Sequence, residues 1–194
     1  RAAIEMGNID VVRWLLVDKK CNFDGDDIDE TPIELAITCG RYDLYQWFVN
    51  NLEYSKGGRK DYKYFDGGMT PLHIAARMGD LEFIKALNPK EDELKVMDNQ
   101  GWMPIHHAFD QWWVNESSEE VMRYFLDCQG VNQLTGDGKT FLHMSHDGLF
   151  SSVEAARMVV EEYGSEHLIY QRCRNGLLPI HYAIDRSDDL LLEL

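Results

Sequence analysis

The stretch Thr70-Pro71-Leu72-His73 is the clearest copy of a short block that recurs along this chain of 194 residues. Four further copies are visible, namely Thr31-Pro32-Ile33-Glu34, Met103-Pro104-Ile105-His106, Thr140-Phe141-Leu142-His143 and Leu178-Pro179-Ile180-His181. Pro71 and Pro104 are 33 residues apart, and the other steps between copies are somewhat longer. Such near-constant spacing is typical of repeat proteins, in which each repeat is a small unit that packs on the next.

The residues around Thr70 predict a helix with defined ends. The Thr70 hydroxyl can accept an N–H that has no partner in the first turn, and Pro71 suits the first helical position because it lacks an N–H. Ala75 and Ala76 are small enough to let a neighbouring helix approach closely. Gly79 ends the helix because glycine adopts a positive φ at low cost.

A second helix is expected after each of these first helices. Apolar residues recur there at helical spacing, as at Leu81, Phe83, Ile84 and Leu87. Comparable apolar patterns lie at 9–16, 44–48, 121–125 and 153–160. Each unit therefore reads as one turn followed by two antiparallel helices.

This unit resembles the ankyrin repeat, and residues 70–87 are close to the consensus of that family. The resemblance covers essentially the whole chain. It implies an all-α fold, an ankyrin-repeat solenoid of helix–turn–helix units with β-hairpin-like turns. Four positions depart from the family pattern: Asp29 stands for Gly, Met103 and Leu178 for Thr, and Phe141 for Pro.

We expect a single array over residues 1–194 with about six repeats, the terminal ones partial. The approximate repeats are 1–20, 26–54, 66–97, 98–134, 135–172 and 173–194. Terminal repeats of such arrays normally carry a polar outer face, and neither end of this chain reads like one. We therefore expect the chain to be a portion of a longer protein.

The composition bounds the class of partner and the compartment. The formal net charge is −15, which argues against direct nucleic-acid or anionic-membrane binding and favours a protein partner with a basic or neutral surface. The four cysteines have neither metal-site nor disulfide spacing, which suits a reducing, intracellular and cytoplasmic location. No apolar run approaches the roughly 18 residues of a membrane-spanning helix, so no transmembrane segment is expected.

Four of the seven histidines occupy the last position of the block, at His73, His106, His143 and His181. The family resemblance implies that each imidazole hydrogen-bonds the turn of its own or the next repeat. Successive copies should lie on the order of 10 Å apart, too far to share a metal ion with bonds of about 2 Å. We predict no metal, no cofactor and no catalytic residue.

Two other segments contain residue types that occur in catalytic or metal sites. Residues 143–147 contain Ser, His and Asp, but no Gly-x-Ser-x-Gly turn accompanies them, so a hydrolase is not expected. The acidic run 24–30 lacks the third acid and the glycine of a calcium loop, and a solvated tip is the simpler interpretation.

Residues 51–68 form the largest insertion and carry four basic residues and three tyrosines. Two alternatives stay open for them: the insertion binds an acidic peptide, or it folds back on the acidic body of the array. The adjacent Trp112 and Trp113 cannot both point inward easily, so at least one is expected to be exposed or to cover an insertion.

The resemblance implies that a partner binds a concave groove made by the turn tips and the exposed face of the first helices. The positions that match, called the groove residues below, are Glu30, Met69, Arg77, Met78, Asn99, Gln100, Trp102, Asp110, Gln111, Lys139, Arg174, Asn175 and Leu177. Trp102 is the strongest single anchor because tryptophan is enriched in binding hot spots. The alternative is that its ring lies flat on a neighbouring hairpin.

Two functions follow from this organisation. The first is a non-catalytic scaffold that binds a partner protein through the groove. The alternative is the targeting or regulatory portion of a larger enzyme, channel or multi-subunit assembly whose active domain lies outside these residues.

Overall fold

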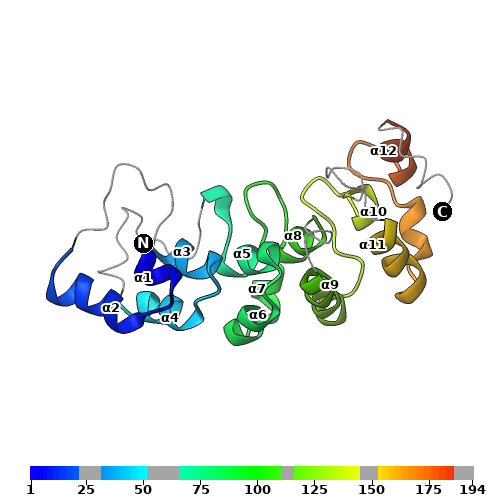
Figure 1. Ribbon diagram of the computed structural model, residues 1–194. Helices are drawn as coiled ribbons and strands as arrows, with labels where there is room; N and C mark the ends of the chain where they lie inside the picture. Colours follow the sequence, from blue (N-terminus) through cyan, green and yellow to red (C-terminus); the bar gives the residue numbers. More distant parts are fainter. Residues whose placement is uncertain (22–31, 52–65, 111–115, 145–152, 186–194) are drawn as a thin grey trace.

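The computed structural model describes residues 1–21, 32–51, 66–110, 116–144 and 153–185. Over these residues the chain consists of helices and the turns that join them, without a β-strand. The helices follow one another along an elongated molecule, with successive pairs side by side (Figure 1). The prediction of an all-α repeat array is therefore confirmed.

Each repeat contributes a first helix, and all repeats but the last also have a described second helix. The first helices are α1 (Ala2–Glu5), α3 (Pro32–Thr38), α5 (Pro71–Met78), α8 (Pro104–Asp110), α10 (Phe141–Met144) and α12 (Pro179–Asp185). The second helices are α2 (Ile9–Arg13), α4 (Tyr42–Asn50), α6 (Leu81–Leu87), α9 (Glu116–Gln129) and α11 (Val153–Arg157).

Several short elements complete the array. The second helices α2 and α11 continue as π-helical turns over Trp14–Asp18 and Met158–Glu162. A four-residue helix, α7 (Glu91–Leu94), follows α6, and 3-10 turns lie at Asp66–Gly68 and Glu166–Tyr170.

Helix α5 has the ends that its sequence predicts. The Thr70 hydroxyl accepts from the His73 N–H, and Pro71 is the first helical residue. Gly79 ends the helix with φ +71°, a conformation that costs glycine little. Asp80 then caps α6 by accepting from the Phe83 N–H at 2.9 Å. The turn between the two helices is thus specified by local residues.

The first helices contact one another in order along the array, from α1 and α3 through α5, α8 and α10 to α12. Ala75 and Ala76 of α5 are each 1% exposed, so these small residues lie inside the stack as expected. Phe141, which stands where the other copies have proline, is fully buried with its ring 5.4 Å from that of Phe109. The aromatic ring therefore fills space between neighbouring repeats.

The turn tips are joined by backbone hydrogen bonds. The Asn99 N–H donates to the Gly67 carbonyl and the Gly136 N–H to the Gly101 carbonyl, both at 2.7 Å. A Cβ atom on Gly101 would lie 2.8 Å from the Gly136 Cα, so this approach requires glycine. The tips form a continuous row that fixes the spacing of their side chains.

Two observations bear on the chain's surroundings. Within the described ranges, every helix is too short or too polar to cross a membrane. All four cysteines, Cys21, Cys39, Cys128 and Cys173, are free thiols.

Candidate partner-binding groove

The histidines of the recurring block hold the starts of the first helices. In the four copies that end in histidine, the imidazole Nδ1 accepts from the backbone N–H three residues earlier. The donors are Thr70, Met103, Thr140 and Leu178, at 3.0, 2.9, 3.1 and 2.9 Å. Met103 and Leu178 have no hydroxyl, yet their helices begin at the same place because the histidine supplies the hydrogen bond.

The same imidazoles connect each repeat to the next. With Nδ1 accepting, Nε2 carries the proton and donates to a backbone carbonyl of the following repeat. His73 reaches the Trp102 carbonyl at 3.0 Å, and His143 reaches the Leu177 carbonyl at 3.2 Å. Burial lowers the pKa of His73 and of His106 to about 4, so both are neutral at pH 7. The structural interpretation of these histidines is confirmed.

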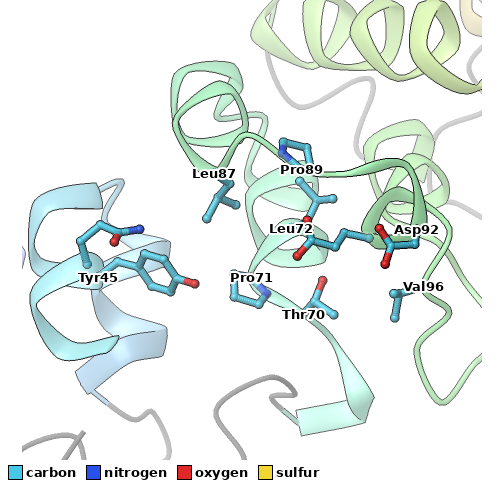
Figure 2. Close-up of a pocket in the computed structure, with 10 residues that line it drawn as sticks. Tyr45, Thr70, Pro71, Leu72, Leu87, Pro89, Asp92 and Val96 are labelled. Carbon is cyan, nitrogen blue, oxygen red and sulfur yellow. The ribbon is translucent and has the colours of Figure 1, made fainter. Parts of the chain in front are cut away.

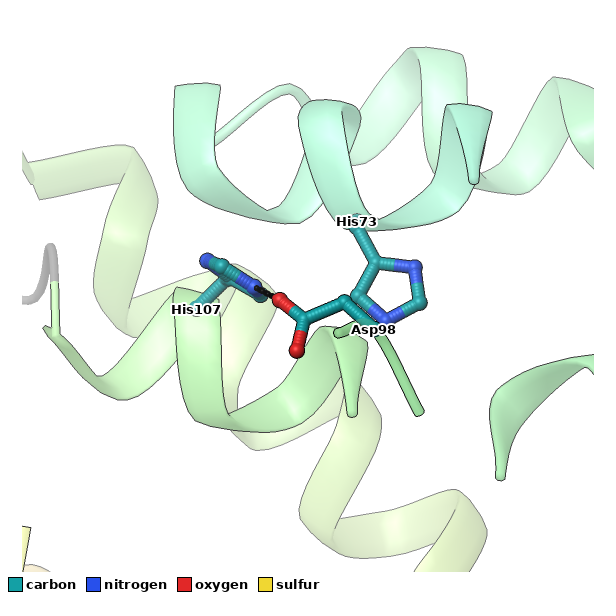
Figure 3. A group of neighbouring side chains, drawn as sticks. All are labelled: His73, Asp98 and His107. Carbon is teal, nitrogen blue, oxygen red and sulfur yellow. Dashed lines mark hydrogen bonds and ion pairs between the residues drawn. The ribbon is translucent and has the colours of Figure 1, made fainter. Parts of the chain in front are cut away.

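One cluster brings together residues that the sequence did not connect. His73 of α5, Asp98 of the following turn and His107 of α8 are all buried, and their ligand-type atoms lie within 4.8 Å of one another (Figure 3). The Nε2 atoms of both histidines have partners, because His73 Nε2–H donates to the Trp102 carbonyl and His107 Nε2–H donates to Asp98 Oδ2 at 2.8 Å. Hydrogen bonds therefore hold this cluster together.

Asp98 organises the turn tip that carries Trp102. Its Oδ1 accepts from the Gln100 and Trp102 N–H groups at 2.8 and 2.9 Å, and its Oδ2 accepts from His107. Burial raises the pKa of Asp98, but the hydrogen bonds from Trp102, His107 and Gln100 outweigh it and leave the pKa below its ordinary value. The carboxylate is thus ionised and fixes the tip.

The Trp102 side chain is half-buried against this cluster. Its ring centroid lies 5.3 Å from that of His107, with an interplanar angle of 59°. The His107 ring in turn lies 5.5 Å from the His73 ring, edge to face. Trp102 therefore packs against the His107 ring, and part of its surface stays exposed, since the residue is only half-buried.

The other groove residues differ in exposure. Those with exposed side chains are Arg77, Met78, Asn99, Gln100, Arg174, Asn175 and Leu177, and the half-buried ones are Met69, Trp102, Asp110 and Lys139. Glu30 and Gln111 lie outside the described residues, as do the acidic run 24–30, Trp112 and Trp113, residues 145–147 and most of the 51–68 insertion.

Two cations among the groove residues contact neighbouring side chains. Arg77 Nη1 donates to Met69 Sδ at 3.9 Å, which links the turn tip at Met69 to α5. Lys139 lies 3.6 Å from Asp137, and its ammonium lies 5.1 Å from the Tyr182 ring centroid. The side chains of Arg77 and Lys139 are thus oriented by their neighbours.

Sequence reasoning missed Asp98 and the role of His107. No motif marks either residue, and only the three-dimensional stacking of α5 on α8 brings them together. One signal was available: an acid three residues before the turn glycine Gly101 can accept from the N–H groups of the turn.

The fold and the row of tips define a helical repeat protein with a side-chain surface suited to binding. Residues 53–132 match the family described as ankyrin repeats (3 copies). Over residues 53–132 the chain is therefore an array of ankyrin repeats.

Several curated proteins are similar to parts of this chain. Protein phosphatase 1 regulatory subunit 12A of Mus musculus is 26% identical over 139 residues, covering 72% of this chain and 12% of that protein. SMC5-SMC6 complex localization factor protein 1 of Homo sapiens is 32% identical over 121 residues, covering 60% of this chain and 11% of that protein. Glycerophosphocholine phosphodiesterase GDE1 of Candida albicans is 25% identical over 109 residues, covering 55% of this chain and 9% of that protein. The chain thus spans about a tenth of these relatives' length.

Proposed function

We propose that this array is a non-catalytic module that binds a partner protein through the groove residues. The observation that carries the proposal is the fixed tip at 98–102, where Asp98 and His107 hold Trp102 with part of its ring open. A large aromatic side chain held in one position loses little conformational entropy on binding, and such residues dominate interface energetics. Arg77 and Met69 offer a cation and a thioether nearby on the preceding repeat.

The partner is proposed to have a basic or neutral surface, with no direct role for nucleic acid. A net charge of −15 on the chain attracts basic surfaces over long range and repels phosphate backbones. The four free cysteines support a reducing compartment, and we place the protein in the cytoplasm.

An alternative is that the array is the targeting or regulatory portion of a larger enzyme, channel or multi-subunit assembly. Two of the relatives are named as a regulatory subunit and a localization factor, and the third as a phosphodiesterase. In each of them the matched part is 12% of the protein or less, so other segments could carry the activity.

The groove proposal is tested by comparing partner capture by two double variants. Trp102→Ala with Arg77→Ala removes the anchor and the nearby cation, and we expect at least about tenfold weaker binding of the natural partner. The control is Trp14→Ala with Arg13→Ala, which removes the same residue types from exposed positions outside the groove. Partner identification by mass spectrometry is followed by titration of the purified partner. Equal binding by both variants would overturn the proposal.

A further inference from the structure

A pocket outside the groove lies between the second and third described repeats. It has a volume of about 370 Å³ and is lined by residues of α4, the first turn of α5, the end of α6 and α7. None of the groove residues lines it. The volume falls in the range of about 300–1,000 Å³ in which small ligands and inserted side chains bind.

Part of the pocket wall is apolar and rigid. Pro71 and Leu72 come from α5, Leu87 from the end of α6, and Pro89 from the turn that follows α6 (Figure 2). Leu72 is 4% exposed, so this part of the wall belongs to the core. Prolines at two wall positions limit backbone movement, because the ring fixes φ.

One side of the pocket is acidic. Asp92 and Glu93 of α7 are exposed carboxylates, and Glu93 is held in place because its Oε2 accepts from the Lys90 N–H at 2.8 Å. Tyr45 lies on the other side, with its hydroxyl directed into the space (Figure 2). Burial raises the pKa of Tyr45, and its electrostatic interactions with Tyr42 and Glu93 act in the same direction, so its hydroxyl stays protonated.

The α4 wall is also fixed. The Tyr42 hydroxyl donates to the Ala86 carbonyl at 2.7 Å, and the Gln46 side chain donates to the Tyr42 oxygen at 3.0 Å. The Tyr45 ring lies 5.5 Å from that of Phe83. These bonds join α4 to α6 and keep the pocket open at a set width.

From this geometry we infer that the pocket is a second protein-binding site that takes a lysine side chain from a basic segment of a partner. A lysine has an aliphatic stem that suits Leu87 and Pro89, and an ammonium group that suits Asp92 and Glu93. Its three N–H donors can also reach the Tyr45 oxygen. An acidic side chain would meet two like charges there and is excluded.

The test is a titration of the whole chain, followed by amide NMR, with the peptide acetyl-Ala-Leu-Lys-Leu-Ala-amide. We expect saturable shifts centred on Tyr45, Gln46, Leu87 and Asp92. Replacing the peptide's lysine by norleucine should weaken binding about tenfold, as should Asp92→Asn with Glu93→Gln in the protein. Gln at 93 can still accept from Lys90, so the fold is kept.

Two controls separate the pocket from general charge and from the groove. Asp43→Asn with Glu82→Gln removes the same charge from exposed sites outside the pocket lining and should change the affinity by less than about twofold. Trp102→Ala should leave peptide binding unchanged, whether or not the groove function holds. Equal loss in both charge variants, or loss with Trp102→Ala, would overturn the inference.

The rival occupant is the chain's own basic insertion. It carries Lys56, Arg59, Lys60 and Lys63 between α4 and α5. If the native chain fails to bind the peptide but the variant with all four changed to Gln binds it, the pocket serves the chain itself and the partner inference is wrong.

Discussion

The buried histidines His73, His106 and His107 make the stability of this array depend on pH. In all three the pKa is lowered, principally by burial, although Asp98 opposes the effect at His107. A lowered pKa means that the unfolded chain binds protons before the folded chain does. Stability therefore decreases as the pH falls from about 6.5 towards about 4. The lowered pKa of Asp98 adds a loss only below its ordinary value of 3.8.

We predict that the free energy of unfolding drops between pH 7 and pH 5 by about 2 kcal/mol for each histidine that stays neutral in the folded state. Urea titrations at several pH values measure it. His106→Gln removes one proton-binding group, so the drop should shrink by about the same amount, even if the variant is less stable at pH 7. If the free energy of unfolding of this variant falls between pH 7 and pH 5 as much as that of the native chain, His106 does not contribute to the pH dependence.

At the scale of elements, the sequence predicted the first helices well because their starts are encoded locally. Thr70, Pro71 and Gly79 each satisfy or release particular backbone groups, and the structure uses them in that way. The sequence predicted less of the candidate site. Asp98 and His107 are joined by packing between repeats, and α7 follows no repeat pattern that the block could reveal.

The row of turn tips gives a prediction at this scale. Gly101→Ala would place a methyl group 2.8 Å from the Gly136 backbone at φ +79°, whereas Gly130→Ala at φ +74° meets nothing within 4 Å. Both substitutions carry the strain of a positive φ, of about 1 kcal/mol. Only Gly101→Ala also separates two repeats, so it should lower the free energy of unfolding by about 1–3 kcal/mol more. Chemical denaturation of the two variants compares them directly, and equal losses would show that the tips are not closely packed.

At the scale of the whole molecule, stability should be distributed between neighbouring repeats rather than held in one core. In the described part of the chain each first helix contacts the first helix of the next repeat. Links between second helices also join neighbouring repeats, such as the ion pair of Arg123 with Glu162 at 2.6 Å. Arrays of this kind behave approximately as a sum of repeat and interface terms. A local defect should therefore have a local effect.

Ile105 of α8 tests this idea because it is fully buried and α8 packs on α5 and α9. Ile105→Ala leaves a cavity and should cost about 2–5 kcal/mol of stability. Hydrogen exchange measured by mass spectrometry should then speed up most in α5, α8 and α9, and little in α1 and α2, because the latter repeat shares no interface with α8. A uniform increase along the chain would mean that the array unfolds as one cooperative unit, and the groove and the lysine pocket would then lose their order together.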